Sequence, residues 1–188
     1  MSDVRLPPLT RDWDRALADL REHGLCLVAD ALPSDMLGRA RDALYRAVED
    51  DACAGRRSAG FTLDRDAGNR RVWNLLNRDP LFAALAEHPL ALHLVQATLG
   101  WPALLSNISG NIVGPGATAG VLHADQVFVP QPWPKRPQGL NVAWCIDDFT
   151  RDNGATEVLP GSHLLARNPR GDDDVRDLVP IEAPAGTA

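Results

Sequence analysis

The stretch Val121-Leu-His-Ala-Asp-Gln-Val-Phe-Val129 is predicted to be a β-strand, and it carries His123 and Asp125 two positions apart. Side chains two apart on a strand point to the same face, so an imidazole nitrogen and a carboxylate oxygen converge. Two histidines and one carboxylate bind non-haem iron on one face of an octahedron and leave three positions open. The pair therefore predicts two of the three ligands of an iron site, although such a triplet alone also fits an ordinary exposed strand.

Short β-type segments surround this stretch on both sides. They are predicted at residues 104–113, 140–147 and 156–159, and turns such as GPGATAG and PQPWPKRPQ separate them. Several short strands punctuated by glycine and proline are typical of a sandwich or a barrel.

Helices are predicted mainly before residue 100. One begins at a Thr10 cap and ends at Gly24, and a second begins at Ser34 and carries an apolar stripe. Two short helices, 80–87 and 89–99, each open with a proline. Short strands are expected at 25–29 and 71–76, and a polar loop at 51–69.

Composition sets limits on the function. The chain has 188 residues, 45% of them hydrophobic, and a formal net charge of -6, which argues against nucleic acid as the main partner. The sequence contains no run of about 18 apolar residues, so no membrane span is predicted. The N-terminus lacks the pattern of a secretory signal. Three widely spaced cysteines indicate reduced thiols, so a cytoplasmic location is expected.

Two further motifs follow the histidine–aspartate pair in a fixed order. They are NVAWCIDDFT at 141–150 and NGATEVLPGSH at 153–163. Together with LHADQ, they make the chain, from about residue 25 to its end, resemble the phytanoyl-CoA dioxygenase family. The resemblance implies an α+β fold in a single domain, 1–188. Its core would be a double-stranded β-helix (jelly roll, cupin-like), with the N-terminal helices packed outside.

The same resemblance implies roles for individual residues. His123 and Asp125 would ligate iron, and a second group would face the co-substrate 2-oxoglutarate: Trp144, Asn111, Asn107 and Arg71. Each member of this second group has a structural alternative. The tryptophan could belong to the core, the asparagines to turns or edges, and the arginine to the surface. His163 of the PGSH motif is expected to lie outside the metal's ligand shell.

Two elements of the family pattern are missing from the sequence. Family members supply a second histidine and then an arginine well past the PGSH motif, but this chain has no histidine after His163. We therefore expect a domain that is C-terminally incomplete, without the last strands of the barrel, and 188 residues that alone bind iron and 2-oxoglutarate poorly. The alternative is a naturally short relative that has lost the reaction.

The resemblance implies an Fe(II)- and 2-oxoglutarate-dependent dioxygenase. With molecular oxygen, and ascorbate as a reductant, it would hydroxylate an unactivated C–H bond of a small organic or carrier-bound substrate and release succinate and CO2. Basic residues of the proline-rich loop, Lys135 and Arg136, could contact an anionic substrate. One rival is a non-catalytic jelly-roll binding module. A zinc hydrolase is a second rival, disfavoured because no HExxH pattern is present.

Overall fold

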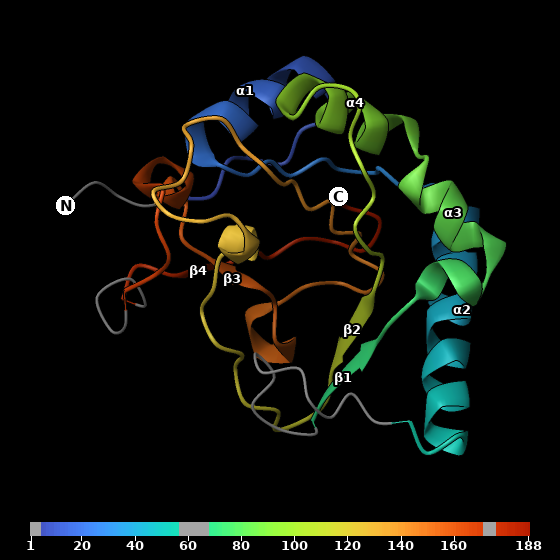
Figure 1. The fold of residues 1–188 in the computed structure, drawn as a ribbon. Coiled ribbons are helices and arrows are strands. Elements are labelled where there is room, and N and C mark those ends of the chain that lie inside the picture. Colours follow the sequence, from blue (N-terminus) through green and yellow to red (C-terminus); the bar gives the residue numbers. More distant parts are fainter. Residues whose placement is uncertain (1–4, 57–67, 171–175) are drawn as a thin grey trace.

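The computed structural model describes residues 5–56, 68–170 and 176–188. Figure 1 shows a mixed helical and β arrangement, with the longer helices at the periphery and short strands inside. The helices are α1 (Trp13–His23), α2 (Ser34–Cys53), α3 (Pro80–Ala86) and α4 (Pro89–Thr98). The strands are β1 (Asn69–Val72), β2 (Gly110–Val113), β3 (Glu157–Val158) and β4 (Val179–Pro180). Short 3-10 helices are η1 (Leu75–Asn77), η2 (Asp125–Phe128), η3 (Arg151–Asn153) and η4 (Ser162–Leu165).

Helix α1 begins two residues later than the sequence predicted. Asp12, not Thr10, is the N-cap: its carboxylate accepts from the backbone N–H groups of Asp14 and Arg15. The Thr10 hydroxyl instead accepts from the N–H of Asp12, at 3.0 Å. Gly24 ends the helix in the left-handed region at φ 77°, as predicted, because a glycine adopts this conformation without steric cost.

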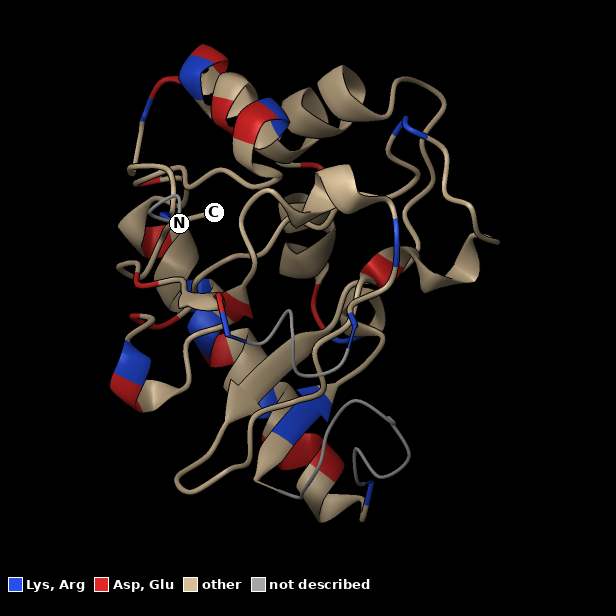
Figure 2. Ribbon diagram, turned by 90° about the vertical axis from the view of Figure 1, so that its left-hand side faces the viewer, with Lys and Arg blue, Asp and Glu red and all other residues tan. Residues whose placement is uncertain are grey.

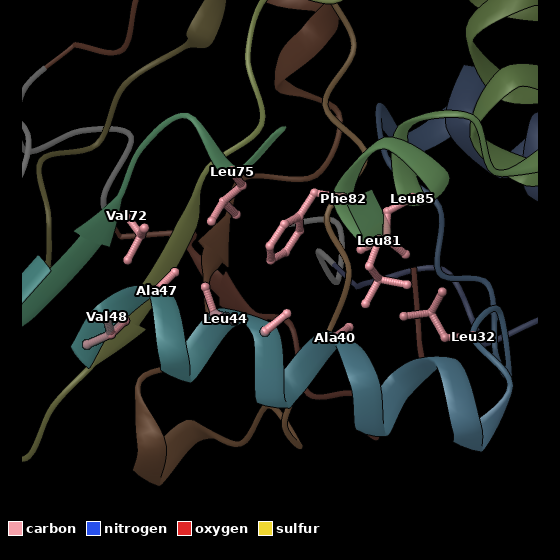
Figure 3. Close-up of a cluster of buried hydrophobic side chains, with 11 residues drawn as sticks. Leu32, Ala40, Leu44, Ala47, Val48, Val72, Leu75, Leu81, Phe82 and Leu85 are labelled. Atoms are coloured by element: carbon pink, nitrogen blue, oxygen red, sulfur yellow. The ribbon is translucent and has the colours of Figure 1, made fainter. Parts of the chain in front are cut away.

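The main hydrophobic core lies between α2, α3 and the β1–β2 pair. The predicted apolar stripe of α2 faces it, and Figure 3 shows Ala40, Leu44, Ala47 and Val48 pointing towards α3 and β1. Phe82 of α3 fills the centre. The cluster comprises Leu32, Ala40, Ala43, Leu44, Ala47, Val48, Val72, Leu75, Leu81, Phe82 and Leu85. Helix α2 thus covers one face of the β1–β2 pair.

A second, smaller cluster joins α1 to α4. It contains Ala16 and Leu17 of α1, Val28, and Leu90 and Leu94 of α4. The two helices lie side by side at the top of Figure 1. Backbone hydrogen bonds connect Val28 and Ala188 in both directions, at 2.7 and 3.0 Å, so the last residues lie beside this cluster. None of the helices in the three described ranges is long and apolar enough to cross a bilayer.

The sheets are smaller than the sequence predicted. Strand β1 pairs antiparallel with β2, and β3 with β4, so the described residues form two separate two-stranded sheets. Mixed helix and sheet is confirmed. The predicted strands 121–129 and 140–147 are absent, 25–29 contributes only the single bridge Val28–Thr10, and the others are shorter. An apolar run favours extended backbone, but a strand also needs a partner that completes its hydrogen-bond ladder. The closed jelly roll stays a prediction.

Charged residues show no separation by sign along the helices. Acidic and basic side chains are interspersed there (Figure 2), and several form ion pairs. Asp51 near the end of α2 receives hydrogen bonds from Arg56 and Arg78, at 2.7 Å each. Burial opposes ionisation of this carboxyl, but the two arginines prevail and its pKa lies below the usual value. These contacts tie α2 to the segment before α3.

Gly110 of β2 lies close to a side chain of α2. A Cβ at this position would lie 2.3 Å from Cδ1 of Leu44, which is buried. We expect Gly110→Ala to lower the free energy of unfolding by about 1–3 kcal/mol, because overpacking displaces core side chains. The matched control is Gly38→Ala on the exposed side of α2, where a Cβ meets nothing within 4 Å. It should stabilise by roughly 0.5–1 kcal/mol. Urea unfolding measures both, and equal effects would contradict this account.

Candidate metal-binding site

His123 and Asp125 come together although they do not lie on a strand. The Nε2 atom of His123 lies 3.2 Å from Oδ1 of Asp125. Ala124 between them has extended backbone, with φ -116° and ψ 133°, and η2 begins at Asp125. One extended residue is enough to place the i and i+2 side chains on the same side. The pair is half-exposed, with side-chain exposures of 40% and 63%.

Hydrogen bonds orient the imidazole for this contact. Nδ1 of His123 donates to the carbonyl oxygen of Val121 at 2.8 Å, so Nε2 faces the carboxylate. The hydrogen bond with Asp125 raises the pKa of His123 despite partial burial, and the same bond lowers the pKa of Asp125. Both directions reflect the attraction between the carboxylate and a proton on the imidazole. A divalent cation replaces such a proton, and a histidine held by a backbone carbonyl is typical of metal ligands. The two residues present fit two ligands of such a cation.

Asn141 is a third member of the site that sequence reasoning missed. Its side-chain amide donates a hydrogen bond to Oδ2 of Asp125. Asn141 stands sixteen residues after Asp125, and nothing in that spacing predicts a contact. Each oxygen of the Asp125 carboxylate therefore contacts a different group: Oδ1 the imidazole of His123 and Oδ2 the amide of Asn141.

Arg71 and Asn111 lie opposite each other on the β1–β2 sheet. They are direct partners in the β1–β2 register, so their side chains share one face of the sheet. Val72 and Gly110, which alternate with them, lie on the face covered by α2. The hydrogen bond between His123 and Asp125 dominates both pKa shifts, and the positive charge of Arg71 adds a smaller effect that disfavours protonation of either residue. In Figure 1, η2 lies on the opposite side of β2 from α2.

The other two predicted co-substrate residues have different surroundings. Trp144 is half-buried against the main core, and its ring packs edge-on against His88 with the ring centroids 5.0 Å apart. His88 caps α4 by accepting from the N–H of Leu90, and burial lowers its pKa. Asn107 is exposed in the segment before β2. Of the six predicted site residues, His123 and Asp125 are in direct contact, and the charge of Arg71 acts on both. Asn111 shares the sheet face of Arg71, whereas Trp144 packs on the core and Asn107 is exposed, so the co-substrate roles stay predictions.

The proline-rich loop after η2 is anchored at both ends. The N–H of Gln138 donates to the side-chain oxygen of Gln126 at 3.0 Å, and the indole N–H of Trp133 donates to the carbonyl of Val129 at 2.8 Å. Arg136 donates to the carbonyl of Leu99 at the end of α4. Arg136 therefore caps the C-terminus of α4, whereas the sequence alone suggested that it could contact an anionic substrate.

His163 contacts the end of α1. Its Nε2 donates to the carbonyl of Arg21 at 3.1 Å, and its ring lies against Gly24, where a Cβ would come within 2.4 Å. The N–H of Gly161 donates to the carbonyl of His23 at 2.7 Å. The PGSH motif therefore caps the C-terminus of α1.

A surface hollow lies between α2 and residues 147–148. Arg41, Asp42, Tyr45, Asp147 and Asp148 line it. The polar side chains that line it are bonded to one another: Asp147 accepts from Arg41 at 2.9 Å and from the Tyr45 hydroxyl at 3.0 Å. Asp148 accepts from the N–H of Ala185 at 2.8 Å. In the described part of the chain, no cluster of three or more His, Cys, Asp or Glu residues could hold a metal ion.

The chain is similar to a known protein family and to several known proteins. The family described as "Phytanoyl-CoA dioxygenase (PhyH)" matches residues 20–188. "Dioxygenase af480" of Aspergillus fumigatus is 37% identical over 183 residues, which is 95% of this chain and 58% of that protein. "Uncharacterized protein Rv1501" of Mycobacterium tuberculosis is 31% identical, covering 87% and 60%. "Multifunctional dioxygenase ausE" of Emericella nidulans is 28% identical, covering 83% and 54%. The chain spans a little over half the length of these relatives.

Proposed function

The chain belongs to the phytanoyl-CoA dioxygenase family, and from this premise we propose that the protein is an Fe(II)- and 2-oxoglutarate-dependent dioxygenase. It hydroxylates an unactivated C–H bond of a small organic or carrier-bound substrate and releases succinate and CO2. The observation that carries the proposal is the contact between Nε2 of His123 and Oδ1 of Asp125. Relatives named dioxygenases support the general activity.

In this proposal, His123 and Asp125 hold the iron, which when bound supplies the activation of oxygen. The Val121 carbonyl keeps the ring nitrogen of His123 turned towards the metal position. Arg71 contributes positive charge beside the pair, which favours an anionic co-substrate such as 2-oxoglutarate. Asn111, opposite Arg71 on β2, offers an amide on the same face. Trp144 and Asn107 remain proposed co-substrate residues on the family resemblance alone.

The remaining parts of the assignment are proposals of the same kind. The fold is proposed to be the cupin-like jelly roll that is general in the family. The third iron ligand is not assigned to any described residue, so the 188 residues by themselves are expected to hold iron weakly, through two ligands. A cytoplasmic location, and a partner set without nucleic acid or membrane, follow only from composition.

Succinate formation tests the proposal, because succinate is released whichever substrate is oxidised. The natural gene product, with whatever segments accompany residues 1–188 in it, is incubated with Fe(II), ascorbate, 2-oxoglutarate and candidate substrates, free and carrier-bound. We expect succinate that depends on Fe(II) and disappears when Zn(II) replaces it. Tight binding of 2-oxoglutarate or a substrate without succinate would favour the non-catalytic binding module. Hydrolysis supported by Zn(II) would favour the zinc enzyme.

A further inference from the structure

The carboxylate of Asp125 has two oxygens with different partners. Oδ1 lies 3.2 Å from Nε2 of His123, and Oδ2 accepts a hydrogen bond from the side-chain amide of Asn141. The terminal torsion of an aspartate is broad and nearly two-fold, so a carboxylate with no such bond would exchange its oxygens freely. The hydrogen bond from Asn141 makes the two oxygens of Asp125 unequal, because it holds Oδ2 and not Oδ1.

The fold, and not the carboxylate, sets the position of Asn141. Leu140 just before it packs against the α1–α4 cluster. Cys145, four residues after it, is buried. Its N–H donates to the carbonyl of Thr187 at 2.9 Å, and its carbonyl accepts from the N–H of Gly186 at 2.8 Å. The backbone is therefore held on both sides of Asn141. The backbone that carries the Asn141 amide is therefore fixed by contacts other than the one with Asp125.

The chemistry of the donor also matters. An amide N–H is neutral, so it can hold one carboxylate oxygen without forming an ion pair that competes with a cation for Asp125. A lysine or arginine in the same place would neutralise the carboxylate. The amide leaves the negative charge of Asp125 available on the side that faces His123.

We infer that Asn141 is a positioning residue for Asp125, and that it makes Asp125 a one-oxygen ligand by holding Oδ2 and leaving Oδ1 to a metal beside His123 Nε2. This inference rests on the proposed function, because it concerns the same metal position. A carboxylate that binds through one oxygen occupies one coordination position instead of two. That leaves more of the metal's coordination sphere for the co-substrate and oxygen.

Site-resolved metal binding tests the inference without an activity assay. Co(II) is titrated into residues 1–188, and the backbone amide signal of Ala124 is followed by NMR, which measures even weak affinities at one position. We expect Asn141→Leu, which keeps the size but removes the donor, to weaken Co(II) binding by about 10–100-fold, as is usual for residues that orient a ligand. Asn141→Gln, which keeps the amide, should retain most of the affinity. Asn168→Leu, the same change at an exposed asparagine, should bind like wild type.

The outcomes separate the inference from the proposed function. If wild type shows no Co(II) shift at Ala124, or if the shift survives in His123→Ala, both the proposed metal pair and the role of Asn141 are overturned. If wild type binds through His123 and Asn141→Leu binds equally well, the role of Asn141 alone is overturned. Equal losses in Asn141→Gln and Asn141→Leu would also overturn it, because the donor would not matter. If the leucine disturbs the fold, Co(II) binding is measured in Asn141→Ala, a second variant without the donor, and the same loss of affinity is expected.

Discussion

Phe82→Ala is expected to lower the free energy of unfolding by about 3–5 kcal/mol, a large part of the 5–15 kcal/mol that stabilises a typical domain. Phe82 is 3% exposed and lies at the centre of the main cluster, where α3 meets α2 and β1 (Figure 3). Removing its ring leaves a cavity that a helix, fixed at its N-terminus by the Asp79 cap, closes only partly. Urea unfolding followed by circular dichroism measures the change.

The same substitution at Phe128 is the matched control. Phe128 lies at the end of η2 and is 71% exposed, so Phe128→Ala removes an identical group from solvent contact rather than from the core. Surface substitutions of this kind usually change stability by no more than about 0.5 kcal/mol. A loss at Phe128 as large as that at Phe82 would show that the ordered core does not lie where the structure places it.

The helical part of the fold could be predicted because its signals are local. Gly24 ends α1, Pro80 and Pro89 open α3 and α4, and the stripe from Ala40 to Val48 faces the core, as the sequence indicated. Each of these signals acts within one or two turns of the chain. The Asp12 cap was missed because Thr10 is also a capping residue, and only the observed hydrogen bonds decide between them.

The β part and the site depended on distant partners. The run 121–129 has strand-like composition, but it forms no strand, and its residues 125–128 form η2. The pairing of Arg71 with Asn111 joins residues forty positions apart. The i, i+2 spacing still placed His123 next to Asp125, because a single extended residue between them has the same effect as a strand. Spacing could not reveal Asn141, whose contact depends on the path of the whole proline-rich loop.

His123→Ala is expected to reduce activity with little effect on stability, and His163→Ala to reduce stability with little effect on activity. The two variants together distinguish a metal ligand from a residue that stabilises the fold. His123 contacts Asp125 and the Val121 carbonyl at a half-exposed position, so its loss should change stability little. In the natural gene product, succinate formation should fall by about 100-fold or more. A bound metal contributes several kcal/mol to catalysis, and each 1.4 kcal/mol is worth a factor of ten.

His163→Ala should lower the free energy of unfolding by about 0.5–1.5 kcal/mol, because it removes a hydrogen bond to the last turn of α1 and the packing of the ring on Gly24. Succinate formation per folded molecule should stay near the wild-type value. Chemical unfolding and the succinate assay are therefore run on both variants. If His163→Ala loses activity as His123→Ala does while remaining folded, then PGSH supplies a ligand and the assignment of His163 to the helix end is wrong. If neither variant loses activity, the iron does not lie at His123, and the proposed function must be rebuilt on other residues.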